Sequence, residues 1–250
     1  MLPGSVLPPP YNTVARNLVF LQELVRLAGG WKRAGFSPLV VKGAWMILSG
    51  RRSLEDRGLV DIDLLVKPEE LPALLRLLEQ EGYAALPNRG RMYGRQGVPG
   101  PVLDLATEIW YLDPMAFPCC WERADVCRYQ DMAFQGLSPR DHFLYVACHA
   151  LVHHGVLSDK WRRDLALLLA EVGGEDELLG AIADCRLTIP MQYVFARMEQ
   201  EGRPEAAWYL SALTRSRQGQ GHLAFLQHRY YRKLAFSPQG QEIFYGGEVL

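Results

Sequence analysis

The sequence carries almost no net charge. Of its 250 residues, 27 are Lys or Arg and 28 are Asp or Glu, which gives a formal net charge of -1. A chain so close to neutrality has no global electrostatic attraction to nucleic acid or to an anionic membrane surface. No apolar run approaches the roughly 18 residues that a membrane-spanning helix needs. We therefore expect an ordinary globular composition without a membrane partner, and nucleic-acid binding stays an open question.

Cysteine is also scarce. The five cysteines are an odd number, and no two of them form a CxxC pair. This usage is typical of reduced thiols rather than of a disulfide framework or a structural zinc site. The N-terminal stretch MLPGSVLPPPYN lacks the basic region and the continuous apolar region of a signal peptide. These absences together predict a cytoplasmic protein.

The spacing of apolar residues predicts an α+β front half. Helical spacing, period-two spacing and glycine or proline stops mark its elements. The first elements are a helix from Asn12 to a stop at Gly29-Gly30, a strand at 37–41 and a short helix after Lys42-Gly43. A strand at 60–66, a helix with Pro68 in its first turn and a hairpin around the turn at 97–100 follow. We expect a small mixed β-sheet flanked by helices.

The back half is predicted to be helical. The segment SPRD at 138–141 offers a serine cap and a proline at the first helical position. Helical periodicity then continues through the last part of the chain. The predicted domains are a core with an N-terminal helix at 1–115, an irregular connection at 116–137, and an α-helical C-terminal domain at 138–250.

Two aspartates interrupt the apolar strand VDIDLLV at 60–66. Because side chains alternate along a strand, Asp61 and Asp63 point to the same face. Two like charges on one face repel each other, and burying them is costly unless a cation compensates them. A divalent cation such as Mg²⁺ is one compensator, and an ion pair with Arg57 or Lys42 is the other. Asp104, an acid within the apolar stretch PVLDLATEI, is a candidate third ligand.

A Lys-Gly pair lies between the predicted strand at 37–41 and the helix that follows it. Gly43 permits close approach to the backbone, and N–H groups at a helix N-terminus attract phosphate. Lys42 adds a positive charge that can pair with phosphate oxygens. A plain turn would explain this pair equally well if it stood alone. A phosphate site ahead of paired carboxylates, however, is the layout of a nucleotidyl-transfer site.

These segments resemble the bacterial family of uncharacterised nucleotidyltransferases. The similarity rests first on VVKGAWMI at 40–47, on Arg57 four residues before the first aspartate, and on DIDLLVKPEELPALLRLLEQEGY at 61–83. It continues less specifically in DLATEIW at 104–110 and in the helical segment from 137 to 169. The family places a His-x-x-x-His pair and a Trp-x-x-Asp-Leu motif in that helical segment.

The resemblance implies the DNA polymerase β-like nucleotidyltransferase fold and a divalent-metal site. By this resemblance, Asp61, Asp63 and Asp104 are the catalytic residues and bind two Mg²⁺ ions, with Mn²⁺ as a possible substitute. Lys42, Gly43 and Arg57 are the corresponding nucleotide-binding residues. Arg57 could equally form an ion pair with Asp56 in its own loop.

The implied function is the Mg²⁺-dependent transfer of a nucleoside monophosphate from an NTP to an acceptor. The acceptor could be a small molecule, a peptide, a protein or an RNA end. Ala106 stands where the family usually has histidine. This departure keeps a second hypothesis open, in which a degenerate nucleotidyltransferase fold binds a nucleotide or a protein without catalysis.

Two further groups are weaker candidates. His149 and His153 are four residues apart and share a helix face; with Asp164, they are second-tier candidates for residues of the nucleotide cleft. A polar helix face without a ligand explains them as well. The basic and aromatic segments at 213–222 and 228–233 could contact nucleic acid, although a solvated face is the commoner explanation of such a pattern.

Overall fold

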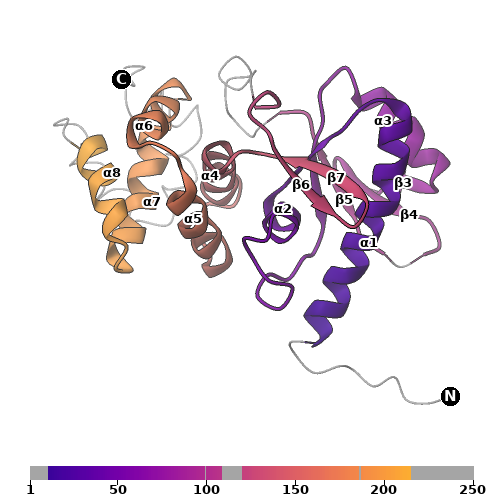
Figure 1. Ribbon diagram of the computed structural model, residues 1–250, viewed down its shortest axis with the longest axis horizontal. Helices are drawn as coiled ribbons and strands as arrows, with labels where there is room; N and C mark the ends of the chain where they lie inside the picture. The colour runs from indigo at the N-terminus through magenta and orange to yellow at the C-terminus, as the bar shows by residue number, and fades with distance from the viewer. Residues whose placement is uncertain (1–10, 99, 109–119, 186, 215–250) are drawn as a thin grey trace. The chain divides into compact units, whose positions relative to one another are not determined.

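The computed structural model describes residues 11–98, 100–108, 120–185 and 187–214. The chain divides into two compact units. The first contains residues 1–108 and 120–138, and the second contains residues 109–119 and 139–250. Figure 1 shows the first unit mainly in indigo to magenta and the second in rose to yellow. No helix within the described ranges is both long and apolar enough to cross a membrane.

A seven-stranded mixed sheet organises the first unit, with the strand order β3-β4-β5-β2-β1-β7-β6. The central pair β1 and β2 is antiparallel, whereas β5 runs parallel to β2 and β7 runs parallel to β1. The strands are β1 (Leu39–Val41), β2 (Ile62–Leu65), β3 (Tyr83–Ala85), β4 (Met92–Arg95), β5 (Leu103–Ala106), β6 (Asp125–Tyr129) and β7 (Met132–Gly136). The predicted hairpin around residues 97–100 is confirmed by the antiparallel pairing of β4 with β5.

One face of this sheet forms the main hydrophobic core. Its helices are α1 (Tyr11–Ala34), α2 (Lys42–Leu48) and α3 (Leu71–Gln80), and the first and last of these are seen beside the sheet in Figure 1. Ile62 and Leu64 of β2 and Leu103 and Leu105 of β5 are buried in this core. Because side chains alternate along a strand, the residues between them face the other side of the sheet. That other side carries the acidic residues.

Three local predictions for the first unit were wrong. Helix α1 continues through Gly29 and Gly30. Gly30 permits close packing of α3, because a Cβ at this position would lie 3.1 Å from Leu77. Pro68 lies in a turn, and α3 begins three residues later with Pro72 in its first turn. The third error concerns the segment predicted as an irregular connection.

Residues 116–137 were predicted to be irregular, but β6 and β7 form a hairpin within this segment. β7 pairs with β1 and so completes the sheet of the first unit. The hairpin was hard to recognise because β6 lies at the edge of the sheet, where none of its residues is fully buried. Edge strands lack the apolar runs that make central strands visible in a sequence.

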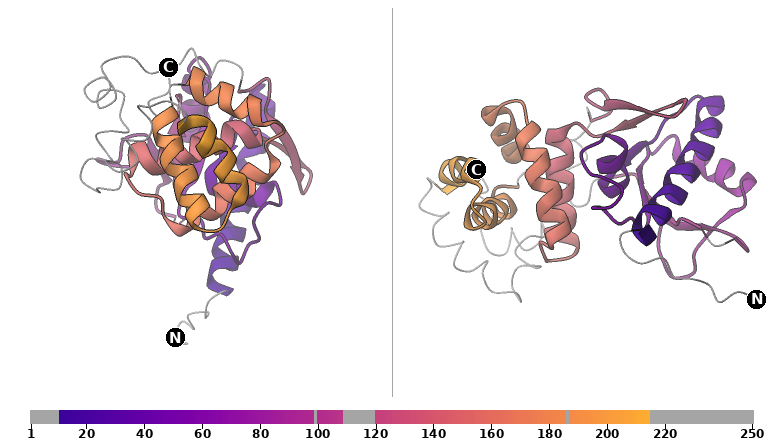
Figure 2. Two further views of the ribbon diagram at one scale, coloured as in Figure 1. Left: turned by 90° about the vertical axis from the view of Figure 1, so that its left-hand side faces the viewer. Right: turned by 60° about the horizontal axis from the view of Figure 1, so that its bottom comes forward.

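The second unit is helical, as predicted. Figure 2 shows its helices from two further directions. They are α4 (Pro139–Cys148), a π-helical turn η1 (His149–His153), α5 (Asp159–Glu171), α6 (Glu175–Asp184), α7 (Thr188–Gln200) and α8 (Pro204–Thr214). Stacked rings of Phe143, Phe195 and Tyr209 connect α4, α7 and α8. Most of the basic segment at 213–222 and all of that at 228–233 lie outside the described residues.

Candidate active site

The strand register brings the acidic residues together. Asp63 of β2 is directly opposite Asp104 of the parallel strand β5, and it is also opposite Val41 at the end of β1. Asp61 precedes Asp63 by two residues and therefore shares its face. A side-by-side position on neighbouring strands places two carboxylates within reach of one ion. The sequence could suggest this arrangement, but only the register establishes it.

The three carboxylates form a compact cluster. One oxygen atom from each of Asp61, Asp63 and Asp104 can be chosen so that all three lie within 4.8 Å of one another. Among the described residues, these three side chains meet the geometry of a metal site formed by at least three His, Cys, Asp or Glu residues. Hard oxygen ligands at this separation suit Mg²⁺ or Mn²⁺. The residues therefore fit a divalent cation.

Lys42 places a positive charge directly beside the carboxylate cluster. Its Nζ lies 2.5 Å from Oδ1 of Asp63, and both side chains are about nine-tenths buried. Lys42 has a φ of 52°, which places a non-glycine residue in the left-handed region between β1 and α2. Such a conformation is costly and is often found at functional sites. The backbone at Lys42 thus holds its ammonium group against the carboxylate of Asp63.

The environment raises the pKa of Asp63 to about 7. Burial is the largest cause, because it disfavours the charged carboxylate. The negative charges of Asp61 and Asp104 raise the pKa further, whereas Lys42 opposes both effects. One lysine therefore does not fully compensate three acidic groups. This excess of negative charge is the electrostatic condition under which a divalent cation binds well.

Gly43 makes room for Arg57 and Leu59. A Cβ at position 43 would lie 2.9 Å from Cδ2 of Leu59 and 3.1 Å from Cζ of Arg57. Both neighbouring side chains are buried, so they have little freedom to move away. The sequence suggested that glycine allows a phosphate to approach the backbone. In the structure, the group that approaches Gly43 closely is the guanidinium of Arg57.

Asn17 holds the loop that carries Arg57, and sequence reasoning missed it. The side chain is fully buried on α1. Its Nδ2 donates hydrogen bonds to the carbonyl oxygens of Leu54 and Arg57, each at 2.8 Å, and its Oδ1 accepts one from the Leu59 N–H at 3.0 Å. An asparagine on the apolar side of an amphipathic helix was the signal available in the sequence. It pointed to a polar contact, but the sequence could not show with which segment.

The second-tier candidates lie in the second unit. The rings of His149 and His153 stack with their centroids 5.3 Å apart, and Nε2 of His149 lies 3.1 Å from Nε2 of His154. The π-helical turn η1 brings these rings together, and such turns are frequent at functional sites. Asp164 is fully buried on α5. The assignment of these residues to a nucleotide cleft stays a prediction.

A mixed sheet with three clustered carboxylates and a Lys-Gly turn defines a nucleotidyltransferase-like protein. The model of a family described as uncharacterised nucleotidyltransferase matches residues 11–200. The chain therefore belongs to the uncharacterised nucleotidyltransferase family. The match includes both Lys42-Gly43 and the three carboxylates, and it also extends into α7 of the second unit.

Among solved structures, the chain is similar to an antigenic nucleotidyltransferase-like protein from Paracoccidioides brasiliensis. The two sequences are 16% identical, and the comparison covers 80% of this chain and 97% of the other, with a TM-score of 0.49. The search of curated proteins finds no match.

Proposed function

We propose that the protein is a Mg²⁺-dependent nucleotidyltransferase that moves a nucleoside monophosphate from an NTP to an acceptor. The observation that carries this proposal is the cluster of Asp61, Asp63 and Asp104 on neighbouring strands, in a chain that belongs to a nucleotidyltransferase family. Two Mg²⁺ ions are expected to bind, and Mn²⁺ could replace them. The cytoplasmic location expected from the cysteine pattern is part of the same proposal.

The reaction is an in-line displacement at the α-phosphorus of the NTP. A hydroxyl or other nucleophile of the acceptor forms a bond to this phosphorus, and the bond from phosphorus to the oxygen that bridges to the β-phosphate breaks. Pyrophosphate leaves, and the proton of the acceptor is lost. When bound, the divalent ions would stabilise negative charge on the attacking and leaving oxygens.

The carboxylates would have different roles in this reaction. Asp61, directly before β2, and Asp63, on β2, would hold the divalent cations. Asp104 comes from the neighbouring strand and, unlike Asp63, is only half-buried, so it is open to an incoming group. Asp104 would hold the acceptor side of the site and would receive the proton of the acceptor.

Lys42 would exchange partners during the reaction. Its ammonium group pairs with Asp63 in the structure, which keeps part of the carboxylate charge neutral. With a divalent cation bound at the carboxylates, the same ammonium group would pair with oxygens of the β- and γ-phosphates. Arg57, packed against Gly43, would add a second positive charge beside the same turn. Lys42, Gly43 and Arg57 would thus bind the triphosphate together.

The alternative proposal is a module that binds a nucleotide or a protein without catalysis. Ala106 favours it, because the family resemblance predicts histidine at this position. Ala106 follows Asp104 by two residues on β5 and so shares its face, next to Leu65 of β2. A histidine there would stand beside the acceptor side of the carboxylate cluster. Its absence leaves the metal ligands in place and removes one candidate proton carrier.

The test combines mass spectrometry of candidate acceptors with a pyrophosphate-release assay. The protein is incubated with each NTP and Mg²⁺, together with small molecules, peptides, proteins and RNA. We expect the acceptor to gain the mass of one nucleotide and to release one pyrophosphate, in the wild type and in Asp184→Asn, which changes an exposed acid on α6. Asp61→Asn and Asp63→Asn should produce neither. Mg²⁺-dependent NTP binding without any transfer would support the non-catalytic alternative.

A further inference from the structure

The first unit contains a cavity of about 590 Å³ that the proposed transfer reaction does not use. Four segments contribute to its walls: the C-terminal turns of α1, the chain before β1, the chain after β2, and the region of Trp121 with the β6–β7 hairpin. Its volume lies within the range of small-molecule binding sites, roughly 300 to 1,000 Å³. All of these segments belong to the same compact unit.

The cavity lies at the opposite end of the central strands from the carboxylates. Lys42 follows the last residue of β1, whereas the cavity residues Phe36 and Ser37 precede β1. Because β2 is antiparallel to β1, Asp61 lies before β2 and Lys67 lies after it. Lys67 lies four positions after Asp63 along extended chain, a span of about 13 Å. A small molecule in the cavity therefore does not compete directly with a triphosphate held at Lys42.

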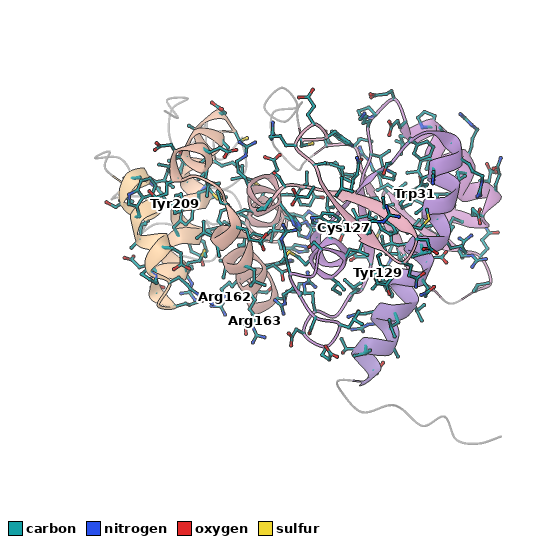
Figure 3. The ribbon with its side chains drawn as sticks, viewed as in Figure 1. Trp31, Cys127, Tyr129, Arg162, Arg163 and Tyr209 are labelled. Atoms are coloured by element: carbon teal, nitrogen blue, oxygen red, sulfur yellow. The ribbon has the colours of Figure 1, made fainter. Side chains whose placement is uncertain are left out.

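Aromatic side chains form three walls of the cavity. Trp31, labelled on α1 in Figure 3, is almost fully buried, and Phe36 and Trp121 are half-buried. The ammonium group of Lys67 lies 5.9 Å from the ring centroid of Trp121. Rings of this kind bind flat apolar groups by stacking or edge contacts. The walls therefore favour a planar, preferably aromatic, ligand.

The charged side chains around the cavity favour a negative group on that ligand. Three cationic and two anionic side chains line it, namely Lys32, Lys67, Arg128, Glu70 and Asp131. Glu70 lies 3.8 Å from Lys67 and so compensates part of its charge. The remaining cations exceed the remaining anion by one. A ligand with a single carboxylate or a similar anionic group would restore the balance.

Three polar atoms of the lining residues are buried without a hydrogen-bond partner among the described residues. They are Nε1 of Trp31, Nε1 of Trp121 and Oε2 of Glu70. A buried donor without an acceptor costs about 1 to 3 kcal/mol, so such atoms are usually paired in the working state of a protein. These atoms are themselves buried, so they lie behind the surface of the cavity. A ligand would therefore contact the aromatic rings and the charged side chains of the lining rather than the indole N–H groups.

We propose that this cavity, here called the tryptophan cavity, binds a small planar aromatic anion independently of the NTP. Trp31, Phe36 and Trp121 would contact its ring, and Lys67 would contact its anionic group with support from Lys32 or Arg128. The site would serve an effector rather than a substrate, because it lies at the opposite end of β1 and β2 from the carboxylates. Nothing in this inference depends on whether the protein transfers nucleotides.

The test uses 2-naphthoate as the probe and 2-naphthamide as its neutral counterpart. Binding to the full chain is measured by isothermal titration calorimetry, and contact with the ring is checked by saturation-transfer NMR. We expect 2-naphthoate to bind with a dissociation constant below about 1 mM and 2-naphthamide to bind about fivefold more weakly, a difference of ~1 kcal/mol. Equal affinities for the two probes would overturn the role of charge.

Variants locate the binding site. Lys67→Gln should weaken 2-naphthoate about fivefold and leave 2-naphthamide unchanged, and Trp121→Leu should weaken both probes. The matched control is Lys160→Gln, because Lys160 lies over the ring of Trp161 in the second unit with Nζ 4.8 Å from the centroid. The affinity of Lys160→Gln for both probes should equal that of the wild type. Wild-type affinity in Trp121→Leu, or no binding of either probe to the wild type, would overturn the proposal.

Discussion

The two ends of the strand pair β1 and β2 carry different chemistry. At one end, Lys42 faces three carboxylates, and its ammonium group is buried against Asp63. At the other end, Lys67 is partly exposed and lies near Trp121 and Glu70, at the edge of the tryptophan cavity. The strands between them are apolar and buried. One short antiparallel pair thus separates the proposed divalent-cation site from the proposed aromatic-anion site.

The burial of a lysine determines whether its charge affects the stability of the protein or only the binding of a ligand beside it. A buried ion pair is strongly coupled, because removing one partner leaves an uncompensated charge in a poorly solvated place. An exposed pair such as Lys67 with Glu70 contributes little to stability, because water screens both charges. Lys42 is therefore expected to control the stability and charge of its site. Lys67 is expected to affect only what binds beside it.

The largest expected effect comes from Asp61→Asn and Asp63→Asn. Each variant removes a negative charge from the carboxylate cluster, and pyrophosphate release should fall by about 10³-fold or more. The assay measures release with saturating NTP and Mg²⁺. The same variants should bind 2-naphthoate as the wild type does, because the tryptophan cavity lies beyond the other end of β2. A parallel loss of naphthoate binding would mean that the two ends are not independent.

Lys42→Met should destabilise the protein without added Mg²⁺ by about 3 kcal/mol at pH 8, because Asp63 loses its buried ion-pair partner. Chemical denaturation measures the free energy of unfolding with and without Mg²⁺. Addition of Mg²⁺ should restore most of the loss. Lys67→Met is the matched change at the other end, and it should alter stability by less than about 0.5 kcal/mol. Equal losses in the two variants would remove the distinction between the lysines.

Asn17→Ala should reduce the free energy of unfolding by about 2 to 3 kcal/mol, since two buried carbonyls and one N–H lose their partner. The released loop carries Arg57, so the KM for NTP should rise more than kcat falls. Steady-state kinetics on folded protein separates these two effects. Asn12→Ala, an exposed change near the start of the same helix, should leave both constants unchanged. A purely structural role for Asn17 predicts an unchanged KM.

The smallest expected effect is a pH dependence from Asp63. Its pKa is about 7 in the folded protein and near the ordinary value of 3.8 when unfolded. The folded state therefore binds the proton more tightly, so this contribution to stability is fully present below about pH 4 and is lost as the pH rises through 7. Relative to the wild type, Asp63→Asn should gain about 2 kcal/mol between pH 5 and pH 8 without metal.

Thermal unfolding of both proteins at several pH values, in the presence of EDTA, measures this difference. Mg²⁺ should reduce the gap at pH 8, because the cation stabilises the charged carboxylates of the wild type. Asp184→Asn, an exposed change, should follow the wild type at every pH. A constant gap between pH 5 and pH 8 would show that Asp63 does not titrate in this range.

Much of the site could be anticipated from the sequence because its signals are local. The strand with Asp61 and Asp63, the turn at Lys42-Gly43 and the pairing of β4 with β5 each depend on a few consecutive residues. The proximity of Asp104 to Asp63 is different, because it depends on a parallel register between distant strands. The family resemblance suggested it, and spacing alone could not.

The features that escaped prediction depend on contacts between distant segments. Asn17 is separated by about forty positions from the loop that it holds, and Gly30 was misread as a helix stop because its neighbour Leu77 belongs to another helix. The β6–β7 hairpin was missed because an edge strand has little apolar pattern. The tryptophan cavity requires residues from four segments, so no motif could reveal it.

The most direct test of the central claim is a titration with Mn²⁺, followed by the electron paramagnetic resonance signal of the free ion. Mn²⁺ stands in for Mg²⁺, and a non-hydrolysable NTP analogue is added in half of the samples. The account predicts that the wild type binds two ions with the analogue and that Asp63→Asn and Asp104→Asn lose this binding, while Asp184→Asn keeps it. Equal Mn²⁺ binding in all four proteins would contradict the assignment of the carboxylate cluster as the metal site.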